Sequence, residues 1–128
     1  MALSAADRLE ILDLAARYNH LMDGRDAEGW AECFTPDGVF DGGPRLQANG
    51  RAELVAFMER LIARDLPAVH WTNNIVIEGS GDSARMTLYL LVIELRDGPI
   101  ATHFGVYHDE LVRTGDGWRF QRRRLGHR

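Results

Sequence analysis

The spacing of apolar residues changes once along this chain, and that change constrains the fold more than any other feature. Up to about residue 64, apolar residues recur three and four positions apart, which is typical of amphipathic helices. From His70 onward they alternate with polar residues, which is typical of strands with one buried face. Helices followed by a long run of strands predict an α+β domain, in which the helices cover one face of a curved, mostly antiparallel sheet.

Three helices are predicted in the first half. The first begins at Ser4, which is a suitable N-cap, and ends before Gly24. The segment "DAEGWAECF" predicts a short second helix capped by Asp26, followed by a turn at "TPDG". The next segment, "VFDGG", indicates a short strand or loop. A third helix is predicted from Gly50 to Arg64.

Four strands are predicted in the second half, joined by turns that contain glycine. They cover His70 to Glu78, Ala84 to Leu95, Ile100 to Arg113, and Trp118 to Leu125. The two middle strands are about twice the common length of roughly 5 to 6 residues, and strands this long make a sheet curl. A curled sheet with helices across its concave face encloses a cone, which is either filled with side chains or hollow.

Composition limits the classes of function. A chain of 128 residues suits one domain over residues 1–128, and the net charge of −4 argues against a nucleic-acid partner. Cys33 is the only cysteine, and the histidines form no known metal-binding motif, so we expect no metal. No apolar run is long enough to span a membrane, and the N-terminus lacks the features of a signal peptide, so we expect a cytoplasmic protein without a membrane partner.

His70 and Asp23 are the candidate catalytic pair. Asp23 is placed in the last turn of the first helix, where the helix dipole disfavours an acid, and His70 opens a strand. A carboxylate beside an imidazole orients the ring and fixes its tautomer, which makes a general base. The structural alternatives are a histidine that only fills space and an aspartate that only forms a turn.

Other side chains are candidates for the pocket wall or for the core beneath it. They are Tyr18, Met22, Trp30, Phe34, Leu54, Phe57, Met58, Trp71, Leu88, Leu90 and Tyr107. His103 is a further pocket candidate, with simple packing as the equal alternative.

The order of motifs resembles the SnoaL-like branch of the nuclear transport factor 2 (NTF2)-like superfamily over nearly the whole chain. The resemblance lies in "YNHLMDGRDAEGWAECFTPDGVF", "GRAELVAFM", "VHWTNNIVI" and "GVYHDELVRTGDGWRFQRRR". It implies a cone-shaped α+β fold with an apolar pocket.

Within that branch the layout is most similar to scytalone dehydratase, hexachlorocyclohexane dehydrochlorinase and bile-acid 7α-dehydratase. The resemblance implies that Asp23 and His70 match the Asp–His dyad of these enzymes. Tyr18 and Arg123 match pocket residues that are present in some of them. The second pocket histidine of the scytalone enzyme has no histidine counterpart, and Glu94 lies near its place, which argues against scytalone as the substrate.

The residues and the resemblance together predict a cofactor-independent lyase or isomerase that acts on a small apolar cyclic or polyketide-like substrate. Tyr18 and Arg123 are the candidates to hydrogen-bond the leaving group or the developing oxyanion. The alternative is a non-catalytic module that binds a small ligand, or an accessory subunit of a larger enzyme.

We also expect a homodimer, or alternatively a trimer, that packs through the convex face of the sheet. The residues predicted on that face are Thr102, Phe104, Val106, His108, Arg122 and Arg124.

Overall fold

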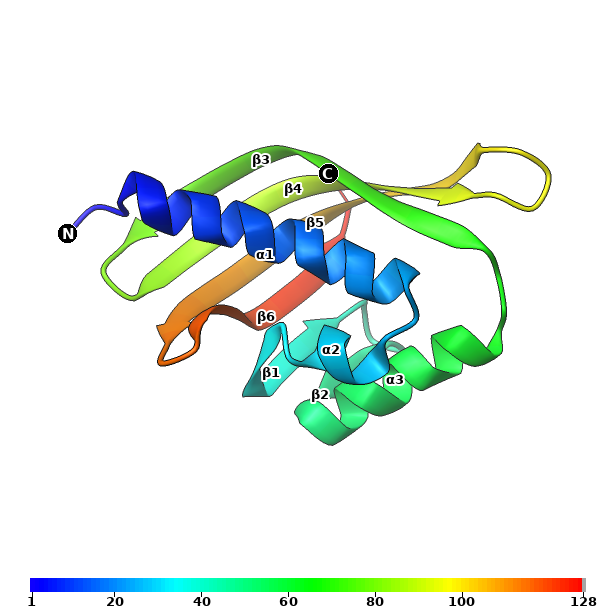
Figure 1. Ribbon diagram of the computed structural model, residues 1–128, viewed down its shortest axis with the longest axis horizontal. Helices are drawn as coiled ribbons and strands as arrows, with labels where there is room; N and C mark the ends of the chain where they lie inside the picture. Colours follow the sequence, from blue (N-terminus) through cyan, green and yellow to red (C-terminus); the bar gives the residue numbers. More distant parts are fainter. Residues whose placement is uncertain (128) are drawn as a thin grey trace.

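The computed structural model describes residues 1–127, which form three helices and a six-stranded sheet (Figure 1). In chain order the elements are α1 (Ala5–Asp23), α2 (Ala27–Ala31), β1 (Phe34–Asp41), β2 (Gln47–Asn49), α3 (Arg51–Ala63), β3 (Ala68–Ser80), β4 (Ser83–Glu94), β5 (Ile100–Thr114) and β6 (Gly117–Gly126).

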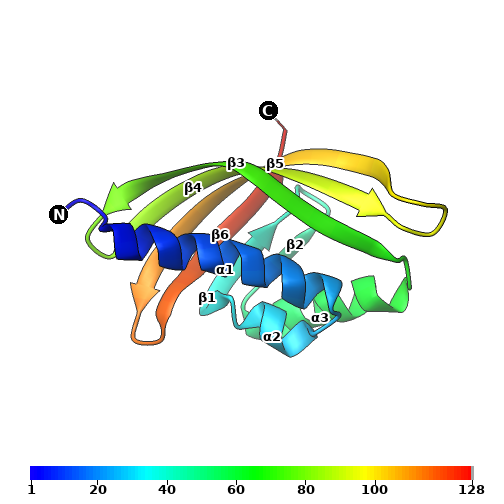
Figure 2. The same ribbon diagram turned by 45° about the horizontal axis from the view of Figure 1, so that its top comes forward.

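The sheet has the order β2-β1-β6-β5-β4-β3. All neighbouring strands run antiparallel except β1 and β6, which run parallel. The long strands curl, and the helices lie across the concave face, whereas no helix covers the convex face (Figures 1 and 2). The predicted α+β architecture is therefore confirmed.

Helix α1 crosses the sheet with a well-defined start and end. The Ser4 hydroxyl accepts a hydrogen bond from the backbone N–H of Asp7 at 3.0 Å, and the Asp7 carboxylate accepts one from the backbone N–H of Ser4 at 3.1 Å. This reciprocal pair satisfies two donors at the helix terminus. The helix ends where the Gly24 N–H donates to the carbonyl of His20, which leaves Asp23 in the last turn. Its buried residues are Ile11, Leu14, Ala15, Tyr18, Asn19 and Met22.

An aromatic cluster fills the middle of the cone. The rings of Trp30 and Phe34 lie 5.2 Å apart between centroids, and those of Tyr18 and Phe120 lie 5.5 Å apart, in tilted or edge-on arrangements. Burial of each such side chain contributes about 1.5–3 kcal/mol. The cone is solid here, so any cavity lies toward one of its ends.

One prediction of local structure is wrong, because "TPDG" lies inside β1 instead of forming a turn. The short strand β2, which pairs with β1, was not predicted. The turn residues are accommodated because the pairing of β1 with β6 shifts register between Phe34 and Val39. Partners of β1 lie at the far end of the chain, and this long-range pairing overrides the local preference for a turn.

Strand β3, the first of the four predicted strands, begins at Ala68, two residues before its predicted start at His70.

No helix within residues 1–127 is long and apolar enough to cross a bilayer.

Candidate active site

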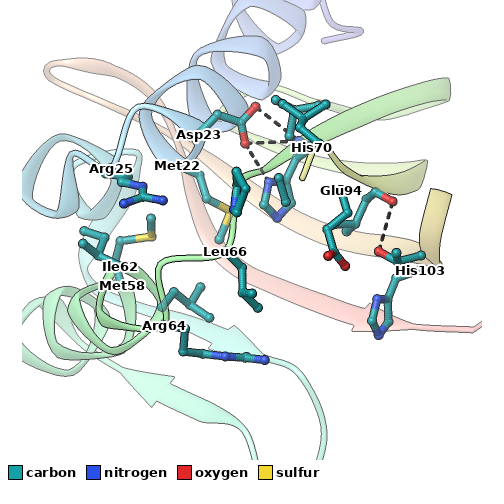
Figure 3. Close-up of a pocket in the computed structure, with 17 residues that line it drawn as sticks. Met22, Asp23, Arg25, Met58, Ile62, Arg64, Leu66, His70, Glu94 and His103 are labelled. Carbon is teal, nitrogen blue, oxygen red and sulfur yellow. Dashed lines mark hydrogen bonds and ion pairs between the residues drawn. The ribbon is translucent and has the colours of Figure 1, made fainter. Parts of the chain in front are cut away.

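A pocket of about 450 Å³ opens at the end of the cone where α1 stops (Figure 3). Residues from the ends of α1 and α3 form one side, and the start of β3 with the adjoining ends of β4 and β5 forms the other. Its walls are mostly apolar, and its ionisable residues are Asp23, Arg25, Arg64, His70, Glu94 and His103. Residues 1–127 contain no group of three or more His, Cys, Asp or Glu side chains placed to hold a metal ion.

Asp23 and His70 meet in the wall of this pocket. Oδ1 of Asp23 lies 2.7 Å from Nδ1 of His70, and the two side chains are 21% and 19% exposed. The backbone N–H of His70 donates to both carboxylate oxygens, at 3.1 and 3.2 Å. A carboxylate only accepts hydrogen bonds, so Nδ1 carries the proton and donates it, which leaves Nε2 as the free basic nitrogen.

Local structure explains why the two residues meet. Helix α1 ends at Asp23, and β3 begins beside it. Asn19 lies one turn before Asp23 on α1, and Thr72 lies two residues after His70 on β3. Nδ2 of Asn19 donates a hydrogen bond to Oγ1 of Thr72 at 3.0 Å. The helix end and the strand start are therefore joined at two consecutive levels, which fixes the carboxylate relative to the ring. In Figure 3 the ring of His70 extends from β3 into the space between Leu66 and Glu94.

The other two predicted catalytic residues lie in the core. Arg123 is fully buried and donates to both oxygens of Asp109, from Nε at 2.9 Å and from Nη2 at 3.0 Å. Its guanidinium stacks 3.6 Å from the ring centroid of Tyr107 and 4.3 Å from that of Tyr18. Neither Tyr18 nor Arg123 lines the pocket, which differs from the expectation that they donate to a substrate.

Burial dominates the electrostatics of this core cluster. Desolvation raises the pKa of Asp109 to about 6, although the Arg123 guanidinium opposes that shift. Desolvation also holds the pKa of Tyr18 well above its usual range, so its hydroxyl stays protonated. The cluster is a packed, buried ion pair surrounded by aromatic rings, and none of its members lines the pocket.

The remaining predicted pocket residues divide into three groups. Met22, Met58 and His103 line the pocket. The second group is buried in the core beneath it and consists of Trp30, Phe34, Leu54, Phe57, Leu88, Leu90 and Tyr107. The third group is Trp71 alone.

The prediction for Trp71 is wrong, because its side chain is 62% exposed on the convex face. Successive side chains on a strand point to opposite faces, and the Trp71 side chain projects away from the face on which His70 lies.

Much of the pocket wall was not predicted from the sequence. Leu61 and Ile62 at the end of α3, together with the connection from Arg64 to Pro67, supply the wall opposite the sheet. A connecting loop carries no periodicity, so no sequence signal placed it there. Glu94 was placed near a pocket position by the resemblance, and the register explains its location, since it lies two residues beyond Val92, the partner of His70 on β4.

Comparisons with known proteins agree with this architecture. The sequence profile of the SnoaL-like domain matches residues 4–124. The uncharacterized protein Rv2910c of Mycobacterium tuberculosis is 29% identical over 122 residues, which cover 92% of this chain and 83% of that protein.

Two solved structures are also similar. An NTF2-like protein with a cystatin-like fold from Novosphingobium aromaticivorans is 29% identical, with a TM-score of 0.88 over 94% of this chain and 81% of that one. ActVI-ORFA from Streptomyces coelicolor is 29% identical, with a TM-score of 0.83 over 94% and 96% of the two chains. The chain therefore belongs to the SnoaL-like family and has an NTF2-like fold.

Proposed function

We propose that this protein is a cofactor-independent lyase or isomerase in which His70, oriented by Asp23, removes a proton from carbon. The supporting observation is the 2.7 Å contact between Oδ1 of Asp23 and Nδ1 of His70 in the wall of an apolar pocket. The bond fixes the tautomer before a substrate arrives, so the base needs no reorganisation.

The reaction begins when Nε2 of His70 takes a proton from a carbon next to an electron-withdrawing group such as a ketone. The imidazole becomes an imidazolium, and the Asp23 carboxylate stabilises its charge without itself taking the proton. The electron pair left on the substrate then expels a leaving group from the next carbon, which is an elimination, or accepts a proton at another carbon, which is an isomerisation. In a cyclisation the pair instead attacks a carbonyl carbon of the same molecule, and the imidazolium returns its proton to the resulting oxyanion.

The pocket suits a small, mostly apolar ring compound. Its volume of about 450 Å³ lies in the range of roughly 300–1,000 Å³ typical of small-molecule sites. Met22, Met58, Leu61, Ile62 and Val92 supply apolar surface around the dyad. Burial of a hydrocarbon ring against them contributes roughly 25 cal/mol for each Å² of apolar surface removed from water.

The direct test is hydrogen–deuterium exchange at the carbon next to the carbonyl of cyclic ketones in D₂O, followed by NMR. We expect the wild-type protein to catalyse exchange and His70→Ala and Asp23→Asn to lose it to a similar degree. His20→Ala is the matched control, because His20 is exposed on α1 and lies outside the pocket. Retention of full exchange by His70→Ala, with the fold intact, contradicts the proposal.

A second candidate is a module that binds a small ligand without converting it, either alone or as an accessory subunit. The observation that favours it is the location of Tyr18 and Arg123, the two expected donors for a leaving group, in the core. Under this alternative, ligands bind the wild-type protein and His70→Ala alike, and no ketone exchanges faster than in buffer.

A further inference from the structure

Glu94 is the second acid of the pocket, and the fold gives it no partner. The residue is half-buried at the end of β4 and lines the pocket. Among residues 1–127, no hydrogen bond or ion pair engages its carboxylate. The Asp23 carboxylate, in contrast, accepts three hydrogen bonds from His70. Of the two pocket acids, only Asp23 is held by the fold, and Glu94 is left free for a ligand.

The strand register places Glu94 opposite the reacting end of the pocket. His70 on β3 pairs with Val92 on β4, and Ala68 pairs with Glu94. Glu94 and His70 are therefore diagonal neighbours on the same face, with roughly 7–8 Å between their Cα atoms. In Figure 3 the Glu94 carboxylate lies between the rings of His70 and His103. A ring compound held between His70 and Glu94 therefore presents one side to each of them.

The free-energy cost of removing water from the Glu94 carboxylate lets this residue discriminate between ligands. In the open pocket, water solvates its carboxylate. A hydrocarbon ligand that fills the pocket displaces this water and leaves the charge unpaired, which is unfavourable. A ligand with a hydroxyl group at that position replaces the lost hydrogen bond. A ligand with a carboxylate there meets a like charge.

We propose that Glu94 is a specificity-determining residue, which selects neutral ring compounds carrying a hydroxyl group across the ring from the carbon that His70 deprotonates. The role of His70 in this proposal rests on the proposed function. The selection of ligands by Glu94 concerns binding alone and does not require a reaction.

The pocket also contains two arginines, which could instead attract an anionic substrate. Arg25 is held by Asp65 through an ion pair of 2.7 Å. Arg64 is exposed and follows α3, on the helical side of the pocket. Both come from the helical layer, whereas Glu94 shares the sheet face of His70, so the group that faces the bound ring beside the base is the acid.

The experiment measures the affinity of three matched probes by calorimetry: tetralone, a hydroxytetralone, and a carboxytetralone substituted at the same ring position. A charge-assisted hydrogen bond predicts that the wild type binds hydroxytetralone about tenfold or more tighter than tetralone, and carboxytetralone weakest. We expect Glu94→Leu to abolish the advantage of hydroxytetralone, and Glu94→Gln to reduce it. The affinity for carboxytetralone should rise in both variants. Glu59→Gln, an exposed position on α3 outside the pocket, should keep the wild-type order.

Two outcomes overturn the proposal. In one, the wild type binds hydroxytetralone no better than tetralone. In the other, carboxytetralone binds best and Arg64→Gln weakens it, which assigns selection to the arginine side. Binding requires no turnover, so the expected order of affinities without any deuterium exchange supports the role of Glu94 and contradicts only the proposed reaction. Deuterium exchange without the expected order of affinities supports the proposed reaction and contradicts the role of Glu94.

Discussion

The two faces of the sheet differ in what covers them, because the helices lie across the concave face and leave the convex face open. On the concave face, β3 and β4 present His70, Val92 and Glu94 to a pocket beneath the helices. On the convex face, which no helix covers (Figure 2), Trp71 of β3 and Phe104 of β5 are 62% and 52% exposed. Because side chains alternate along a strand, one stretch of sequence builds both a binding site and a free surface.

The convex face also carries a row of alternating charges. The strand register places Glu78 beside Arg85, Arg85 beside Glu110, and Glu110 beside Arg122. Two copies can pack with these faces together about a two-fold axis that runs parallel to the strands, between β4 and β5. The order of the row in one copy is then opposite to that in the other, so that every acid of one copy faces an arginine of its partner. We therefore continue to expect a homodimer through this face.

Two residues expected on the convex face are not part of that surface. Thr102 lines the pocket, because a register shift between Val92 and Ile93 interrupts the alternation there. Val106 is buried, at 2% exposure. The exposed patch on the convex face is therefore smaller than expected from the alternation of residues along the strands.

The largest expected effect concerns the concave face. Loss of either member of the dyad, in His70→Ala or Asp23→Asn, should lower turnover of a true substrate by about 10² to 10⁴, since the two act as a unit. Both side chains lie at the rim of the pocket, so thermal unfolding should change little. Steady-state kinetics and a melting curve for each variant provide the check. A double variant much worse than either single variant would show that the two residues act independently.

The next effect separates the core beneath the pocket from the pocket itself. Arg123→Met leaves Asp109 buried without its partner, so the free energy of unfolding should fall by about 3–5 kcal/mol, as for other broken buried pairs. Replacement of both, in Arg123→Met with Asp109→Leu, should recover most of this loss. Urea denaturation measures both values. A single variant as stable as the wild type contradicts the packed ion pair.

The third prediction tests the convex face. Glu110→Arg should weaken self-association by roughly tenfold or more, because it places arginine opposite arginine across the proposed axis. The exchange Arg85→Glu with Glu110→Arg should restore association, since it preserves every opposed pair. Sedimentation at several protein concentrations gives the dissociation constants. A wild-type chain that stays monomeric at micromolar concentration excludes this interface, and catalysis by the concave face should be unaffected.

The smallest effect concerns the ion pair between Asp7 at the start of α1 and Arg113 on β5, at the end of the helix away from the pocket. A hydrogen bond from Arg113, with one from the Ser4 backbone, lowers the pKa of Asp7 well below its ordinary value of 3.8. A carboxyl whose pKa is lower in the folded state than in the unfolded state stabilises the fold at pH values above its ordinary pKa. This stabilisation is lost as the pH falls below about 4. The wild type should therefore lose more stability than Asp7→Asn on acidification from neutral pH. Melting temperatures across that range provide the measurement, and equal slopes for the two proteins contradict it.

The long elements and the proximity of Asp23 to His70 could be predicted from the sequence, whereas the full pocket could not. Periodicity identified α1, α3 and the four long strands because each buries one continuous face. Asp23 stood out because an acid at a helix C-terminus is locally disfavoured. The same reasoning failed for β1, whose partner lies far along the chain, and for Arg123, since a spacing pattern does not show whether a cation is buried against an acid.

The parallel pairing of β1 with β6 has a consequence for synthesis on the ribosome. Phe34 is made early, but the strand that covers it, with Phe120, is made near the end of the described chain. Until β6 emerges, β1 presents an unpaired edge, and Trp30 and Phe34 lack part of their packing. Closure of the sheet is therefore a late event that joins distant segments, which predicts slow folding and a nascent chain that depends on chaperones.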